Sequence, residues 1–266
     1  MTALSPGNAR VKQARKLSRR SERSERRLFL AEGEKALAEA LSVPGCVVEV
    51  FATADATARL RARYDDPSLT WSVVTDPALD SLADTVTPQG VVAVCRSVDR
   101  PLDDVLGSLG DARLVALCAD VRDPGNAGTV VRCADAAGAD AVVLCGHSVD
   151  AGNPKTVRAT VGSLFHLPVA TEPDAAAAVA ALQRAGLQVL AADGAGETDL
   201  DEAADDELLA APTAWLFGNE AWGLPVELAA LADRRVRIPI HGRAESLNLS
   251  TAAAVCLYAS ARAHRP

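Results

Sequence analysis

Residues 114–140 read LVALCADVRDPGNAGTVVRCADAAGAD, and this stretch decides the fold class. Its apolar opening is typical of a buried strand over residues 113–119, and a helical pattern follows over residues 126–137. The turn DPGN joins them, with Asn126 as the expected N-cap, and Gly138 is placed to end the helix. The stretch therefore predicts a strand–turn–helix unit of an α/β protein.

The same alternation continues through the chain from about residue 28. Further strands are expected at 47–52, 70–74, 90–95, 141–145, 187–192, 213–217 and 235–240, and helices near 33–41, 56–64, 154–163, 174–185, 225–232 and 247–263. Strands separated by helices favour a mostly parallel sheet covered by helices. The best boundary between two domains is the polar stretch around residues 97–111.

Arg132 lies within the first two turns of the expected helix 126–137. The helix dipole there favours an anion over a cation, so a guanidinium is explained if it faces a phosphate or a carboxylate. The alternative is a surface arginine whose stem lies over the sheet edge. Sequence alone leaves both interpretations open.

Residues 215–225, WLFGNEAWGLP, form a second turn at the end of a strand. Gly218 allows a close backbone approach, Gly223 turns the chain, and Pro225 suits the first position of a helix. Glu220 lies between the two glycines, at the carboxyl end of a strand, where ligands bind in α/β sheets. It is either part of a ligand site or a solvated loop side chain.

Residues 237–263, RIPIHGRAESLNLSTAAAVCLYASARA, contain a third turn followed by a long helix beginning around Leu247. Ser246, Asn248 and Ser250 place small hydrogen-bonding groups at its start. The free backbone N–H groups of a helix N-terminus favour an anion. Ordinary N-capping would explain Ser246 but not all three polar residues, which favours a functional role.

Charge is distributed unevenly along the chain. A net charge of -8 argues by itself against a nucleic-acid partner, but residues 1–30 hold nine basic residues against Glu22 and Glu25. A basic arm on an acidic body indicates contact with a polyanion, and a solvated helical face is the alternative. The candidate contacts are Arg10, Lys12, Arg15, Lys16, Arg19 and Arg20.

The remaining composition favours a soluble, cytoplasmic protein. Six cysteines form no CxxC pair and are expected as small buried hydrophobes in a reducing compartment. Four scattered histidines indicate no metal site. The N-terminal segment lacks the apolar region of a secretory signal, and the apolar runs are too short to span a membrane.

Taken together and in this order, DPGNAGTVVR, LFGNEAWGLP and IPIHGRAESLNLSTAAA resemble the SpoU branch of the SPOUT methyltransferases, over roughly residues 112–264. The opening NARVKQARKLSRRSERSERRLFLAEGEKALAEAL is similar to the RNA-binding domain of ribosomal-RNA members, a small α/β module like ribosomal protein L-thirty-e. The resemblance implies an RNA-binding domain over 1–103 and a catalytic domain over 110–266 whose parallel sheet contains a trefoil knot. It also implies a homodimer.

The resemblance further implies an S-adenosylmethionine-dependent methylation of a ribose 2′-hydroxyl, with ribosomal RNA as the expected substrate. The basic arm then becomes a set of RNA contacts. The implied cofactor contacts are Phe217, Gly218, Ile238, Ile240 and Leu247, and the implied catalytic and substrate-positioning residues are Asn126, Arg132, Glu220, Ser246 and Asn248. A guanidinium stays protonated in nearly all protein settings, so Arg132 is expected to fix an RNA phosphate and polarise the 2′-oxygen rather than to act as a base.

Three alternative functions compete with this hypothesis. The same chemistry on transfer RNA stays open, as does a non-catalytic RNA-binding or ribosome-assembly protein, although no residue of the motifs is missing. A nicotinamide-dependent oxidoreductase is disfavoured, because Gly194-Ala195-Gly196 lacks the third glycine of the dinucleotide motif and leads into an acidic loop.

Overall fold

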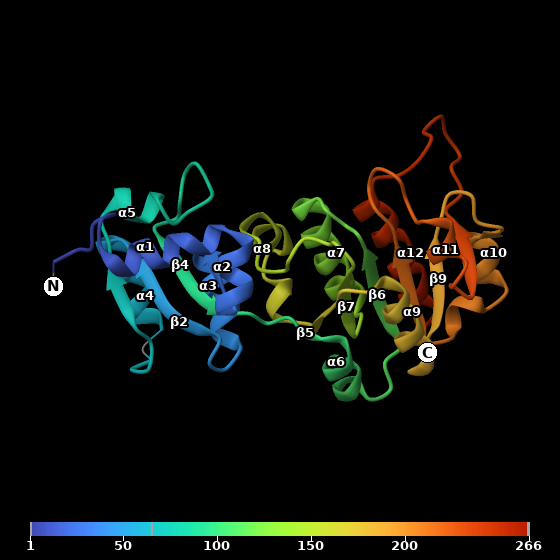
Figure 1. Ribbon diagram of the computed structural model, residues 1–266, viewed down its shortest axis with the longest axis horizontal. Coiled ribbons are helices and arrows are strands. Elements are labelled where there is room, and N and C mark those ends of the chain that lie inside the picture. Colours follow the sequence, from blue (N-terminus) through green and yellow to red (C-terminus); the bar gives the residue numbers. More distant parts are fainter. Residues whose placement is uncertain (1, 65, 265–266) are drawn as a thin grey trace. The chain divides into compact units, whose positions relative to one another are not determined.

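The computed structural model describes residues 2–64 and 66–264, and the chain divides into two compact units. The first unit comprises residues 1–98 together with Gly152–Phe165, and the second comprises Asp99–Ala151 and residues 166–266 (Figure 1). The expected division at 1–103 and 110–266 differs from this arrangement. No helix in the described part of the chain is long and apolar enough to cross a membrane.

The first unit is built on a mixed four-stranded sheet. Its strands are β1 (Leu28–Glu32), β2 (Val47–Ala52), β3 (Trp71–Val73) and β4 (Val91–Arg96), in the order β1-β4-β2-β3. Antiparallel pairs join β4 to β1 and β2, and β2 and β3 are parallel. The predicted strands at 47–52, 70–74 and 90–95 are confirmed, but the prediction of a mostly parallel sheet is wrong for this unit.

Helices surround this sheet. They are α1 (Ala9–Arg15), α2 (Arg20–Arg26), α3 (Glu34–Ser42), α4 (Ala54–Arg63), α5 (Asp76–Asp80) and α8 (Pro154–Thr160), with 3-10 turns at Lys16–Ser18 and Ser163–Phe165. Val11, Ala14 and Leu17 lie at a spacing of three residues and are buried in the core against β4. This stripe turns the basic side chains between them outward.

The segment Gly152–Phe165 belongs to the first unit although it follows β7 of the second. Phe165 stacks on Phe29 with ring centroids 6.1 Å apart, and Arg158 forms an ion pair of 2.7 Å with Asp84. The domain boundary expected from the sequence places this segment in the second domain. The structure differs because α8 packs on β1, a contact that sequence order does not reveal.

The second unit contains an eight-stranded sheet in which every pair of neighbours is parallel. Its order is β10-β12-β9-β11-β6-β7-β8-β5, with β5 (Arg100–Pro101), β6 (Leu114–Ala119), β7 (Ala141–Cys145), β8 (Val169–Glu172), β9 (Gln188–Ala192), β10 (Thr198–Asp199), β11 (Thr213–Phe217) and β12 (Arg234–Arg237). The predicted parallel sheet is confirmed here. The expected strand 235–240 ends earlier, at Arg237.

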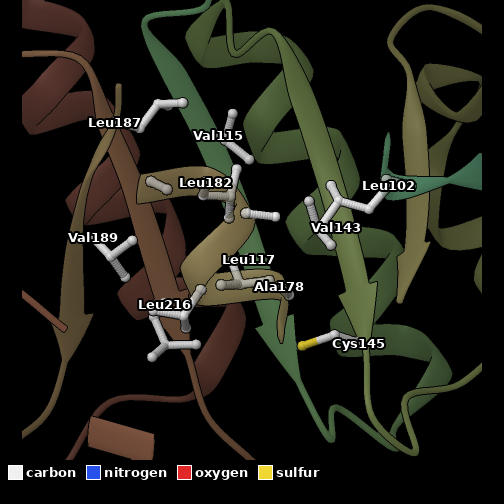
Figure 2. Close-up of a cluster of buried hydrophobic side chains, with 14 of the residues drawn as sticks. Leu102, Val115, Leu117, Val143, Cys145, Ala178, Leu182, Leu187, Val189 and Leu216 are labelled. Carbon is white, nitrogen blue, oxygen red and sulfur yellow. The ribbon is translucent and has the colours of Figure 1, made fainter. Parts of the chain in front are cut away.

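Both faces of this sheet are covered. The helices are α6 (Leu102–Leu109), α7 (Pro124–Ala137), α9 (Ala175–Arg184), α10 (Leu200–Asp205), α11 (Val226–Ala229) and α12 (Leu249–Ala263), with a 3-10 turn at Leu208–Ala210. Figure 2 shows Ala178 and Leu182 of α9 lying among side chains of the strands. Helices α7 and α12 pack on each other and on β6, and α12 also packs on β11. Burial on both faces explains why β6 and β7 are continuously apolar and why β11 is apolar after Thr213.

Two expected helix caps were wrong by a few residues. Pro124 is the first residue of α7, so its cap is Asp123, whose carboxylate accepts the N–H of Asn126 at 2.8 Å. The cap of α12 is Asn248 and not Ser246, because its side-chain oxygen accepts the N–H of Ser250 at 2.9 Å. Both shifts free the expected capping residues for other contacts.

A buried hydrogen bond fixes α12 against β11. The indole Nε1–H of Trp215 donates to Ser260 Oγ at 2.9 Å, and neither residue has exposed surface. Ser260→Ala should lower the free energy of unfolding by about 1–3 kcal/mol, because the buried indole N–H loses its acceptor. Urea unfolding measures this loss. Thr251→Ala, exposed on the same helix, is the control, and equal stability of the two variants would contradict the assignment.

Candidate active site

The loops that follow four neighbouring strands, β12, β9, β11 and β6, meet at the carboxyl edge of the parallel sheet. This is the edge at which ligands bind in α/β proteins. A cavity of about 350 Å³ opens there between the loops after β9, β11 and β12 and the start of α12. Its volume lies within the range of ordinary ligand pockets.

All five residues expected to contact a cofactor line this cavity, namely Phe217, Gly218, Ile238, Ile240 and Leu247. Sequence reasoning missed a further wall, formed by Ala192, Asp193 and Gly194 at the end of β9. A signal for it existed, since a Gly-Ala-Gly turn follows a predicted strand. As a dinucleotide motif, however, that turn is incomplete.

Gly218 is required by the protein's own backbone. A Cβ at this position would lie 2.4 Å from the carbonyl carbon of Gly223 and 2.7 Å from the amide nitrogen of Leu224. Asn219 and Gly223 also exchange two backbone hydrogen bonds of 2.9 Å. The close approach inferred from the sequence is therefore confirmed, but the neighbour is the loop itself.

Glu220 joins the loop after β11 to the loop after β6. Its carboxylate accepts the backbone N–H groups of Arg122 at 3.2 Å and Asp123 at 3.1 Å, and the side-chain amide of Asn126 at 3.3 Å. The negative charge lies at the N-terminus of α7, where the helix dipole favours it. Glu220 is thus an exposed side chain whose carboxylate nevertheless binds the other loop.

Asn126 connects the same loops to the start of α12. The Nδ2 of Asn248 donates to the Oδ1 of Asn126 at 3.1 Å, while the Oδ1 of Asn248 accepts the N–H of Ser250. A chain of hydrogen bonds therefore runs from Glu220 through Asn126 to Asn248. The structure brings these three predicted site residues together.

Asp120 and Asn219 also hold the site and were not predicted. Asp120 adopts a left-handed backbone with φ 54, and its carboxylate accepts the N–H of His147 at 2.6 Å. Buried Asn219 donates through Nδ2 to the carbonyl of Asp120 at 2.7 Å. A strained residue held in this way is typical of functional sites.

Ser246 lines the cavity, whereas Arg132 does not. Arg132 is exposed on α7, and no hydrogen bond or ion pair of its guanidinium is found among the described residues. The structure therefore does not bring Arg132 into the cavity of its own chain.

The cavity is acidic. Asp193, Glu220 and Glu245 line it, and none of its described lining residues is basic. Such a lining favours a ligand that carries positive charge. None of the described lining residues is a cysteine. Burial, and secondly the Asp120 carboxylate, raise the pKa of the Cys145 thiol to about 12. The other cysteines are also buried, except the half-buried Cys133.

Comparison with known proteins identifies both parts of the chain. Residues 113–258 match the SpoU rRNA Methylase family, and residues 8–93 match the MRM3-like substrate binding domain. The chain is 36% identical over 252 residues to the 23S rRNA (guanosine(2553)-2'-O)-methyltransferase RlmP of Bacillus subtilis, covering 94% of this chain and 95% of that protein.

Two solved structures share the whole architecture. The SpoU methyltransferase AviRb from Streptomyces viridochromogenes, in complex with AdoMet (S-adenosylmethionine), has a TM-score of 0.83 at 30% identity and covers 96% of this chain and 98% of its own. The AdoMet-bound rRNA methyltransferase from Sinorhizobium meliloti has a TM-score of 0.81 at 35% identity and covers 98% of this chain and 97% of its own.

The role of Glu220 can be tested without any ligand. Glu220→Ala removes the acceptor of the Arg122 and Asp123 amides, so both should exchange hydrogen faster with solvent. Native-state hydrogen exchange resolves these amides. Glu227→Ala, an exposed carboxylate on α11, is the control and should leave them unchanged. Unaltered exchange in Glu220→Ala would contradict the tie between the loops.

Proposed function

The chain belongs to the SpoU rRNA methylase family, and we propose that it transfers a methyl group from S-adenosylmethionine to a ribose 2′-hydroxyl of ribosomal RNA. The observation that carries the proposal is the acidic cavity at the carboxyl edge of the sheet, whose lining residue Glu220 is hydrogen-bonded to Asn126, which in turn binds Asn248. Large-subunit RNA is the expected substrate, since the relatives of known specificity that cover most of this chain act on 23S rRNA.

The cavity residues fit this cofactor. Its sulfonium and ammonium groups are cationic, which suits a lining of carboxylates without basic side chains. Ile238, Ile240 and Leu247 offer apolar surface for the adenine ring, and Gly218 leaves backbone groups accessible. When bound, the sulfonium supplies an activated methyl group, so the protein's contribution is mainly positioning.

The remaining site residues hold the acceptor. Asn126 and Asn248 orient the ribose, Glu220 keeps them in register, and Ser246 organises the third loop beside the substrate. Arg132 binds the RNA phosphate next to the 2′-hydroxyl through its planar fork and polarises the 2′-oxygen. The proton then passes to that phosphate or to water.

We infer that the working unit is a homodimer. Val255 and Tyr258 are 38% and 50% exposed on α12, and the Tyr258 hydroxyl donates to the carbonyl of Ala136 on α7. Arg132 lies four residues before Ala136 and so shares its helix face. This arrangement supports an interface on α7 and α12 at which Arg132 serves the partner's cavity.

Two finer features of the fold are proposed on the basis of family membership. We propose that the segment from β12 to α12 threads through the loop after β11 and makes a trefoil knot. The support is that α12 returns from the sheet edge to pack on α7, β6 and β11. We also propose that the first unit is an RNA-binding module like ribosomal protein L-thirty-e.

The basic arm is the proposed RNA contact of the first unit. Lys12, Arg15, Lys16 and Arg19 are exposed, and no partner of their side chains is found among the described residues. Other cations of the arm have structural roles. Buried Arg23 donates to the carbonyls of Leu17 and Ser18, and Arg10 pairs with Glu49 at 2.7 Å.

The function is tested with undermodified ribosomal RNA and methyl-labelled S-adenosylmethionine. Nuclease digestion and mass analysis should find the label in a single 2′-O-methylated nucleotide of large-subunit RNA. Label on a base would refute the proposed chemistry. Label in transfer RNA but not in ribosomal RNA would refute the proposed substrate, and cofactor binding without transfer to either RNA would favour a non-catalytic protein.

Cofactor binding can be blocked at Gly194. This residue lines the cavity, and a Cβ there meets nothing within 4 Å, so Gly194→Leu adds volume without straining the backbone. Calorimetry should show the affinity for S-adenosylmethionine falling at least about tenfold with the melting temperature unchanged. The control is Gly107→Leu on α6, which is equally unobstructed and outside the cavity. Equal affinities of the two variants would place the cofactor elsewhere.

Arg132→Ala should bind S-adenosylmethionine normally and fail to transfer the methyl group. If Arg132 serves the partner's cavity, mixing Arg132→Ala with Gly194→Leu subunits restores activity, because one of the two sites in each heterodimer is complete. Random reassortment should give about a quarter of wild-type turnover. A mixture as inactive as its components would show that Arg132 acts within its own chain.

The basic arm should set the salt dependence of RNA binding. Arg15→Ala/Arg19→Ala removes two cations, so the slope of log affinity against log salt should fall by about 1–2 while cofactor affinity stays constant. Arg61→Ala/Arg63→Ala, on α4 of the same unit, is the charge-matched control. An equal slope change in both double variants would mean that the arm is merely a solvated face.

A further inference from the structure

Trp222 is an exposed aromatic residue beside the candidate active site. It lies in the loop after β11, and 54% of its surface is exposed. Trp215 in the preceding strand has no exposed surface, and its indole N–H is satisfied by Ser260. An exposed indole in a chain with only 3% aromatic residues is therefore a feature to explain.

Arg122 covers the indole from the opposite loop. Its guanidinium carbon lies 5.1 Å from the centroid of the Trp222 ring, within the range of a cation–π contact. No hydrogen bond or ion pair of this guanidinium is found among the described residues, so the charge stays available to another anion. Glu220 accepts the Arg122 backbone N–H, which fixes the two loops that carry the pair.

The pair lies at the rim of the cavity. Glu220, Ala221 and Gly223 line it, whereas Trp222 does not. Arg122 directly precedes Asp123, the cap of α7, and the Glu220–Asn126–Asn248 chain begins at the same point. A ligand that reached a methyl donor in the cavity from this side would pass over the indole and the guanidinium.

We propose that Trp222 and Arg122 are positioning residues that hold an unpaired RNA base next to the nucleotide being methylated. The base stacks on the exposed indole face, and the guanidinium binds the adjoining phosphate. Stacking on aromatic or arginine planes is how proteins hold splayed bases of single-stranded RNA. The proposal rests on the proposed function and narrows its substrate to an unpaired segment.

Fluorescence tests the contact directly. Wild-type protein is titrated with a short single-stranded oligoadenylate and with a duplex of the same length. The single strand should quench the indole emission of the wild type, the duplex should quench it less, and Trp222→Ala should show no such quenching. Quenching that persists in Trp222→Ala would overturn the proposal. It would also be overturned if the indole emission of the wild type did not change when RNA is added and changed only with protein dilution.

Kinetics on ribosomal RNA provides the second test. Trp222→Ala should raise the KM for RNA about tenfold, or about 1.4 kcal/mol, with unchanged affinity for S-adenosylmethionine and unchanged melting temperature. Trp222→Phe should restore most of the loss, because a phenyl ring still stacks. Arg122→Ala should raise KM and flatten its salt dependence. Val226→Ala, an exposed apolar side chain nearby, is the control.

The outcomes separate the two proposals. A wild-type protein that methylates no RNA would sink the proposed function itself. A wild-type protein that methylates RNA, with the KM of Trp222→Ala equal to that of Val226→Ala, would sink only the stacking site.

Discussion

The N-termini of α7 and α12 belong to segments more than a hundred residues apart, and a few polar side chains hold them together. The carboxylate of Glu220 binds the start of α7 and the side chain of Asn126. Asn126 in turn accepts a hydrogen bond from Asn248, the cap of α12. These bonds, together with the Asn219–Asp120 hydrogen bond and the packing of α12 on α7, fix how the three loops meet at one edge of the sheet. The cavity lies between these loops, and the Arg122–Trp222 contact joins two of them.

The parallel sheet makes this meeting possible. Because all neighbouring strands run in one direction, the loops after β12, β9 and β11 leave from the same edge. Helices on both faces then bury the strands, so the sheet mainly stabilises the fold. Function is confined to the connections. There Gly218 permits the loop to close on Gly223. Asp120 adopts a left-handed backbone conformation, and Asn219 donates a hydrogen bond to its carbonyl.

Much of this site could be predicted from the sequence, because its residues lie in three motifs whose order is informative. Asn126, Glu220 and Asn248 were expected together, and they are hydrogen-bonded. Capping preferences predicted the role of Asn126 less well, since Pro124 begins α7 and its cap is therefore Asp123. Contacts between segments far apart in the chain could not be predicted from the sequence. Nothing in Gly152–Phe165 reveals that it packs in the first unit, and the wall at Gly194 depends on which strands are neighbours.

The hydrogen bond between Asn126 and Asn248 couples two loops into one site. A double-mutant cycle with Asn126→Ala, Asn248→Ala and the double variant measures this coupling in single-turnover methyl transfer to ribosomal RNA. The loss of the α12 cap affects both arms of the cycle equally and cancels. A coupling of about 0.5–3 kcal/mol is predicted for side chains in direct contact. Effects that add within about 0.3 kcal/mol would show that the two asparagines act independently and would contradict the account.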